Sequence, residues 1–71
     1  MRDKRLSKLA ANIRAERRRK DITQDILSEK VNVSTRSISS IENGYQTPSA
    51  FVVYDIAKAL EVDINELFKG V

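Results

Sequence analysis

A cluster of hydroxyl, amide and guanidinium side chains falls within nine residues of the chain. Its members are Thr35, Arg36, Ser39, Ser40 and Asn43. A solvent-facing helix surface usually carries Glu and Lys instead, because serine favours helix formation less. Short hydroxyls with one arginine suit a surface that approaches the edges of DNA base pairs closely. The cluster therefore favours a nucleic-acid-reading face, and a merely polar helix surface is the alternative interpretation.

The residue types that most often carry out catalysis are missing from the chain. It contains no histidine and no cysteine. Histidine is the usual general base near neutral pH and the commonest metal ligand. Without cysteine there is neither a thiolate metal site nor a disulfide. No pairing of a nucleophile with a base remains, so we expect no enzymatic activity, no metal site, no cofactor and no small-molecule ligand.

Positive charge is concentrated at the start of the chain. Residues 1–20 hold nine Lys or Arg against two acidic residues, a net +7, whereas residues 21–71 carry a net −4. A basic end suggests a polyanionic partner, although a solvated basic helix or a membrane-surface helix would show the same pattern. No apolar run reaches the length of a membrane span, and no signal peptide is visible. We expect a cytoplasmic protein with no membrane partner.

The spacing of apolar residues is helical throughout, and 71 residues are enough for one domain spanning residues 1–71. Helix start signals stand at Thr23, Ser34, Ser49 and Asp63, and Glu66 is spaced to complete a capping box with Asp63. We expect five helices: one from about Lys4 to Lys20, one that starts after Thr23 and ends at Asn32, one that starts after Ser34 and ends at Asn43 and Gly44, one after Ser49, and a short one from Asp63.

The second and third expected helices are joined by a very short connection. Only Asn32, Val33 and the cap residue Ser34 separate them. A turn of this length forces a sharp angle between the helices, as in a helix-turn-helix unit, and excludes an antiparallel hairpin. Asn32 tolerates the left-handed conformation that ends a helix, and Gly44 is suited to the same position after the third helix.

The segment TQDILSEKVNVSTRSISSIENGYQTPS resembles the helix-turn-helix of the lambda-repressor-like superfamily, also called the Xre or phage-repressor type. The resemblance extends over about residues 6–69. It implies a compact all-α fold of five helices, with the helix-turn-helix at the second and third. It also implies a sequence-specific double-stranded DNA-binding regulator, a repressor or controller, whose third helix lies in the major groove.

The resemblance also implies roles for individual residues. Base-contacting positions correspond to Thr35, Arg36, Ser39 and Ser40. Phosphate-contacting positions correspond to Gln24, Ser34, Asn43, Tyr45, Gln46 and Thr47. A buried salt bridge between the first and third helices corresponds to Arg17 and Glu42. The chain departs from the family at Asp21 and Asn32, where glycine is usual.

The fourth expected helix has more apolar residues than one inward face needs. Phe51, Val52 and Tyr54 fall outside its inner face, and Phe68 and Val71 at the chain end extend the same apolar set. We expect these five residues to form the interface of a homodimer that binds a palindromic operator. The alternative is that Phe51 folds back over Tyr45 and that Phe68 closes the monomer core.

Two function classes remain open on the sequence. Phage-type repressors, restriction-modification controllers and antitoxins share this outline, and the sequence does not separate them. The same fold also serves as a protein-interaction module, antitoxin-like or coactivator-like. Exposed Ile26 and Phe51 would favour that second class.

Overall fold

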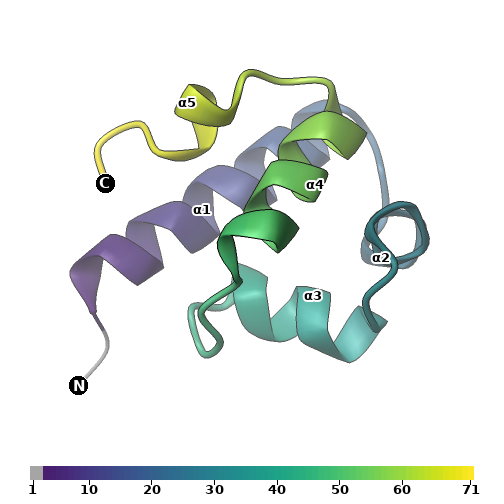
Figure 1. The fold of residues 1–71 in the computed structure, drawn as a ribbon, viewed down its shortest axis with the longest axis horizontal. Helices are drawn as coiled ribbons and strands as arrows, with labels where there is room; N and C mark the ends of the chain where they lie inside the picture. Colours follow the sequence, from purple (N-terminus) through teal and green to yellow (C-terminus); the bar gives the residue numbers. More distant parts are fainter. Residues whose placement is uncertain (1–2) are drawn as a thin grey trace.

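The computed structural model describes residues 3–71 and contains five α-helices (Figure 1). Met1 and Arg2 lie outside the described residues. Arg2 is one of the nine Lys or Arg of residues 1–20. The helices are α1 (Lys4–Arg19), α2 (Gln24–Val31), α3 (Thr35–Glu42), α4 (Ala50–Leu60) and α5 (Ile64–Leu67). Residues 3–71 contain no strand, so the predicted five-helix all-α fold is confirmed. None of the described helices is long and apolar enough to cross a membrane.

Each helix begins at a side chain that caps its first turn. Thr23 Oγ1 accepts from the amide of Ile26 at 3.1 Å, and Ser34 and Ser49 cap α3 and α4 in the same way. These oxygens satisfy amides that have no partner within the helix. The predicted capping box at α5 is only half formed, because the carboxylate of Glu66 lies 3.1 Å from Lys69 Nζ instead of reaching back to Asp63.

Four helices end on a residue in the left-handed conformation. This residue is Asp21 after α1, Asn32 after α2, Gly44 after α3 and Glu61 after α4, with φ between 56° and 75°. After α1, α3 and α4, the amide of this residue and the next amide bond back to two carbonyls of the last helical turn, as in a Schellman motif. The sequence predicted this role for Asn32 and Gly44 but not for Glu61.

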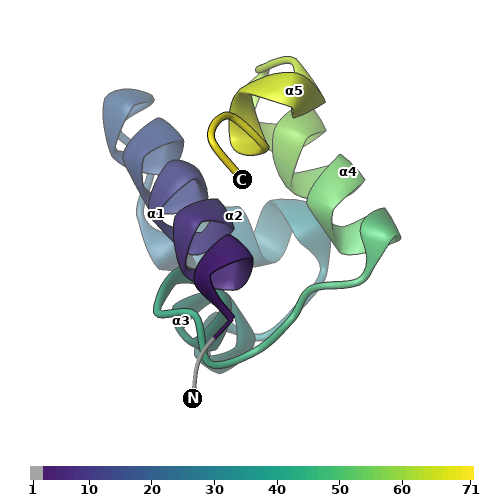
Figure 2. The same ribbon diagram turned by 90° about the vertical axis from the view of Figure 1, so that its left-hand side faces the viewer.

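The hydrophobic core receives side chains from all five helices. Its most completely buried members are Ile13, Leu27, Ile38, Ile41, Ile56, Leu60 and Leu67. α2 packs against both α3 and α4, and α5 packs against α1 and α4 (Figure 2). α3 forms the lower edge of the molecule in both views, so one of its faces meets the core and the opposite face is left uncovered.

Candidate nucleic-acid interface

The two faces of α3 differ sharply in chemistry. Ile38 and Ile41 are buried in the core, whereas Arg36 is exposed and Ser39 and Ser40 are half-buried on the other side. No hydrogen bond or ion pair within residues 3–71 engages the guanidinium of Arg36. Three of the four residues that the resemblance assigned to base contact, Arg36, Ser39 and Ser40, thus share the uncovered side of α3. Thr35 differs from the others in that its hydroxyl is engaged by α2.

The C-terminal end of α3 is fastened by the buried carboxylate of Glu42. Arg17 donates two hydrogen bonds to this carboxylate, from Nε to Oε2 at 2.5 Å and from Nη2 to Oε1 at 2.9 Å. Gln24 Nε2 donates a third, at 3.1 Å to Oε1. The salt bridge implied for Arg17 and Glu42 is therefore present and links α1 to α3. A bidentate pair of this kind fixes geometry as well as charge.

Arg14 adds a contact at the same end of α3 that sequence reasoning missed. Its Nη1 donates to the carbonyl oxygen of Glu42 at 2.6 Å. Arg17 Nη1 likewise donates to the carbonyl of Ile22, at 2.7 Å. A positive charge at the last carbonyls of a helix also complements the helix dipole. The available signal was the spacing of three residues between Arg14 and Arg17, which places both on one face of α1.

The N-terminal end of α3 is held against α2 by hydrogen bonds between side-chain oxygens, not by an ion pair. Thr35 Oγ1 donates to Asp25 Oδ1 at 2.7 Å and lies 3.1 Å from Ser28 Oγ. Ser28 Oγ in turn donates to the carbonyl of Asp25 at 2.7 Å. Asp25 is part of no recognisable sequence motif for such a contact. Its partner is ten residues away, beyond the reach of a local pattern.

The residues assigned to phosphate contact lie around α3 on three segments. Tyr45, Gln46 and Thr47 are exposed on the connection between α3 and α4. Ser34 is exposed where it caps α3. The side chain of Gln24, by contrast, is bonded to Glu42, and the residue is half-buried at the start of α2.

Asn43 is the remaining residue assigned to phosphate contact. It is exposed just after α3, and its Nδ2 donates to the carbonyl of Ser39 at 2.9 Å. The structure thus brings the assigned base-contacting and phosphate-contacting residues to one region around α3.

Several cations of α1 are held in ion pairs. Arg19 bonds Glu16 at the end of the helix, and this carboxylate raises the pKa of Arg19. Arg5 bonds Asp3 at the start, through Nη2 to Oδ2 at 2.8 Å. The hydrogen bonds from the Arg5 side chain and amide lower the pKa of Asp3 to about 2. Fewer of the positive charges in residues 1–20 are therefore free to meet a polyanion than the number of Lys and Arg residues there suggested.

The residues assigned to a dimer interface occupy two places. Phe51 is 81% exposed and Tyr54 53% exposed on the outer side of α4, while Val52 is half-buried against the core. A ring as exposed as that of Phe51 is not folded back over the connection between α3 and α4. Phe68 and Val71 border a separate open groove, of about 270 Å³, beside Leu6 and Leu9 of α1.

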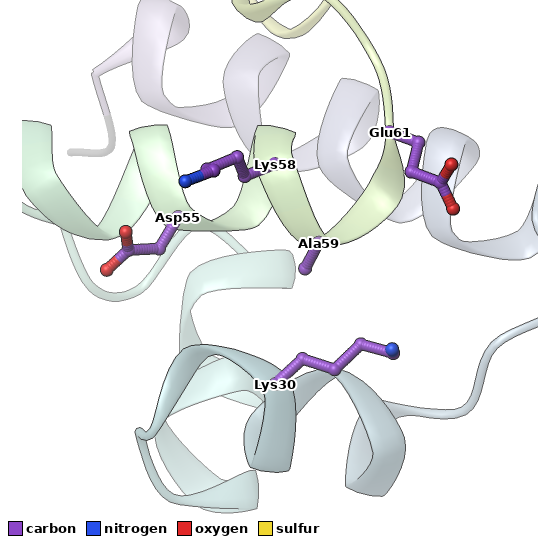
Figure 3. Close-up of a pocket in the computed structure, with 5 residues that line it drawn as sticks. All are labelled: Lys30, Asp55, Lys58, Ala59 and Glu61. Atoms are coloured by element: carbon purple, nitrogen blue, oxygen red, sulfur yellow. The ribbon is translucent and has the colours of Figure 1, made fainter.

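A second open groove, of about 470 Å³, runs between α2 and α4 (Figure 3). Its lining residues are Lys30, Asp55, Lys58, Ala59 and Glu61. Two cations and two anions border the groove, so it presents no single sign of charge to a ligand.

Comparison with known sequences places most of the chain in one family. The profile of the helix-turn-helix family HTH_3 matches residues 13–67. An uncharacterized HTH-type transcriptional regulator of Methanocaldococcus jannaschii is 38% identical over 48 residues, which cover 68% of this chain and 73% of that protein. The uncharacterized HTH-type transcriptional regulator YazB of Bacillus subtilis is 34% identical over 55 residues, 78% of this chain and 80% of YazB.

Solved structures show the same arrangement of helices. The restriction-modification controller protein C.AhdI from Aeromonas hydrophila superimposes with a TM-score of 0.85 at 25% identity, over 89% of this chain and 96% of that one. A point mutant of the controller protein C.Esp1396I gives a TM-score of 0.88 at 32% identity, over 97% of this chain and 87% of that one. With the profile match, these findings show that the chain belongs to the helix-turn-helix family of the lambda-repressor-like, or Xre, type.

Proposed function

We propose that the protein is a sequence-specific regulator of transcription that binds double-stranded DNA with α3 in the major groove. The observation that carries the proposal is the uncovered face of α3, with Arg36 at its start and Ser39 and Ser40 along it. Both ends of this helix are fastened to the scaffold, so the face is presented in one orientation. Relatives named as transcriptional regulators support the same role.

Within this proposal, base pairs and phosphates are contacted by different residues. Arg36 reaches a guanine edge, because a bidentate arginine–guanine contact is the commonest specific contact in the major groove. Ser39 and Ser40 contact neighbouring base edges. Gln24 contacts phosphate through its backbone amide, since its side chain is bonded to Glu42. Further phosphate contacts come from the exposed residues Ser34, Asn43, Tyr45, Gln46 and Thr47.

Selection of bound sequences from a random duplex library tests the proposal and yields the preferred site. Arg36→Ala is then expected to relax the preference at one base pair by about 1–3 kcal/mol. Arg18→Ala removes an exposed arginine of α1 and serves as the matched control, which should leave base preference intact. A uniform loss of affinity for all sequences in Arg36→Ala would show that this residue contacts phosphate only.

Salt dependence tests the electrostatic part of the same proposal. The logarithm of the binding constant should fall linearly with the logarithm of salt concentration, with a slope of about −0.9 for each phosphate neutralised. Because several cations of α1 are ion-paired, we expect a slope of modest size. Binding that does not respond to salt would contradict DNA binding as the function.

The regulator acts, in this proposal, as a homodimer on a palindromic operator, as a repressor or controller. One α3 reads few base pairs, and two half-sites about 34 Å apart give the selectivity that one lacks. The exposed rings of Phe51 and Tyr54 on α4 support this proposal, because burying them between two copies removes apolar surface from water.

Analytical ultracentrifugation at micromolar concentration tests the dimer. We expect Phe51→Glu to shift the protein toward monomer. Ile26→Glu is the matched control, because it places the same charge at an exposed apolar position on α2. A monomeric parent, or a dimer that Phe51→Glu leaves unchanged, would rule out this interface.

A protein-interaction module is the second candidate function, and the 81% exposure of Phe51 is the observation that favours it. Such a module would bind no duplex DNA even at low salt. Binding of random duplex DNA in low salt, abolished by high salt, therefore discriminates between the two functions.

A further inference from the structure

Three oxygen-bearing side chains meet where α2 and α3 join. Ser28 is buried, Thr35 is half-buried and Asp25 is exposed, so the cluster runs from the interior to the surface. The contacts are Thr35 Oγ1 to Asp25 Oδ1 at 2.7 Å, Ser28 Oγ to the Asp25 carbonyl at 2.7 Å, and Ser28 Oγ to Thr35 Oγ1 at 3.1 Å. Three close contacts are thus made with two hydroxyl groups.

The number of protons fixes the direction of these hydrogen bonds. A carbonyl and an ionised carboxylate only accept, so Ser28 and Thr35 each donate their single hydroxyl proton to Asp25. The hydroxyl of Thr35 therefore has no proton left for an acceptor atom on a base. To donate to guanine or thymine it would have to abandon the carboxylate of Asp25.

We propose that Asp25 is a positioning residue for DNA recognition: by holding the hydroxyl of Thr35 it sets the first turn of α3 on α2 and so aims Arg36. The inference rests on the proposed function and assigns Thr35 a structural part in it. Base discrimination then falls to Arg36, Ser39 and Ser40. A bidentate arginine contact needs accurate placement, and Arg36 follows Thr35 directly in the chain.

The charge of Asp25 and its acceptor oxygen act in opposite directions on DNA binding. An exposed carboxylate beside a phosphate-binding face repels every duplex equally, whatever its sequence. The acceptor oxygen orients α3, which affects only duplexes whose bases are read. The ratio of affinity for the selected site to affinity for random duplex therefore isolates the positioning effect from the charge effect.

The experiment compares Asp25→Ala with Asp25→Asn, because both remove the charge but only asparagine keeps a side-chain oxygen that can accept from Thr35. We expect Asp25→Ala to lower the specificity ratio about tenfold and Asp25→Asn to restore it to within about twofold of the parent. Glu29→Ala removes another exposed carboxylate of α2 and should leave the ratio unchanged. An unchanged ratio in Asp25→Ala, measured where the variant is fully folded, would overturn the assignment.

Thr35→Val and Thr35→Ser test the other partner. Valine lacks the hydroxyl and should lower the ratio as Asp25→Ala does, with no further loss in the double variant, whereas serine keeps the hydroxyl and should retain the ratio. Loss of preference at one base pair in Thr35→Val but not in Asp25→Ala would show that Thr35 reads a base itself, and would overturn the proposal.

Melting without DNA separates this inference from the proposed function. Asp25→Ala and Thr35→Val should each lower the melting temperature by about 4–8 °C, and the double variant should melt no lower than either. Additive losses would overturn the inference even if the protein binds DNA. A further outcome is that the parent binds no duplex while the double variant still melts no lower than either single variant. That result would leave the contact between Asp25 and Thr35 in place, but it would overturn both its role in recognition and the proposed function.

Discussion

The two ends of α3 are both tied to the scaffold, but by different physical means. At the C-terminal end a carboxylate that is 1% exposed, that of Glu42, receives Arg17 and Gln24. At the N-terminal end Thr35 and Ser28 bond to the exposed residue Asp25. The first set is an ion pair removed from water, and the second is a set of hydrogen bonds from neutral hydroxyl groups that runs from buried Ser28 through half-buried Thr35 to exposed Asp25.

This difference predicts how strongly each end resists change. Removing one partner of a buried ion pair leaves the other charged and desolvated, which is costly. Removing a hydroxyl at a partly solvated site lets water replace the lost bond. The C-terminal end should therefore dominate stability, while the N-terminal end contributes orientation at a smaller energetic cost.

Glu42→Gln should have the largest effect, because it leaves the guanidinium of Arg17 buried without its counter-charge. We expect the free energy of unfolding to fall by about 3–5 kcal/mol, measured by thermal or urea denaturation. Glu29→Gln makes the same chemical change at an exposed site and should be nearly neutral. Melting of Glu42→Gln within a degree or so of the parent would break the comparison.

Arg14→Ala should cost less, because Arg14 bonds a carbonyl and not the carboxylate. Its side chain is half-buried and donates to the Glu42 carbonyl at 2.6 Å. The expected loss is about 1–2 kcal/mol in urea denaturation. Arg18→Ala is the control for removing an exposed arginine from the same helix. Equal melting of the two variants would show that Arg14 is as dispensable as a solvated residue.

Ser28→Ala tests the opposite end of α3. The variant loses the hydroxyl that donates to the Asp25 carbonyl and lies 3.1 Å from Thr35 Oγ1, and we expect a loss of about 0.5–1.5 kcal/mol. Alanine favours a helix more than serine does, so Ser7→Ala on the exposed side of α1 supplies the correction for propensity. A loss as large as that of Glu42→Gln would contradict the ranking of the two ends.

The pair of Asp3 and Arg5 sets the lower limit of the comparison, because it is fully at the surface. The pKa of Asp3 is lowered from 3.8 to about 2 in the folded protein. Its contribution is therefore complete above pH 3.8 and is lost as the pH falls through 2. The melting temperature of the parent should fall as the pH drops from 3.8 to about 2. Asparagine still caps α1, and Asp3→Asn should show a fall that is only slightly smaller than that of the parent. A large reduction would show that exposed pairs carry more of the stability than burial suggests.

Local chemistry made the helices predictable from the sequence. Thr23, Ser34 and Ser49 cap α2, α3 and α4 because their hydroxyls reach amides three residues away, and this depends on neighbouring residues alone. Gly44 ends α3 for an equally local reason. The pairing of Arg17 with Glu42 spans 25 residues and came from the family resemblance, not from the spacing.

The contacts that sequence reasoning missed are those whose partners lie on other helices. The spacing of Arg14 from Arg17 places both on one face of α1, but only the packing of α1 on α3 brings Arg14 to the Glu42 carbonyl. The inward turn of Gln24 and the bond between Asp25 and Thr35 arise in the same way. Glu61 was missed for a different reason, because glutamate has no preference for the left-handed conformation that α4 requires of it.

The left-handed residues at the helix ends have a consequence for how long the protein lasts in a cell. Asp21, Asn32 and Glu61 each occupy the left-handed conformation, which costs up to about 1–2 kcal/mol for a residue such as Glu61 and less for asparagine or aspartate. Each such increment raises the fraction of unfolded chains several-fold, and unfolded chains are the substrate of cellular proteases. Glycine has no side chain to crowd this conformation, so replacing Glu61 by glycine would lower the fraction of chains that are open to proteolysis.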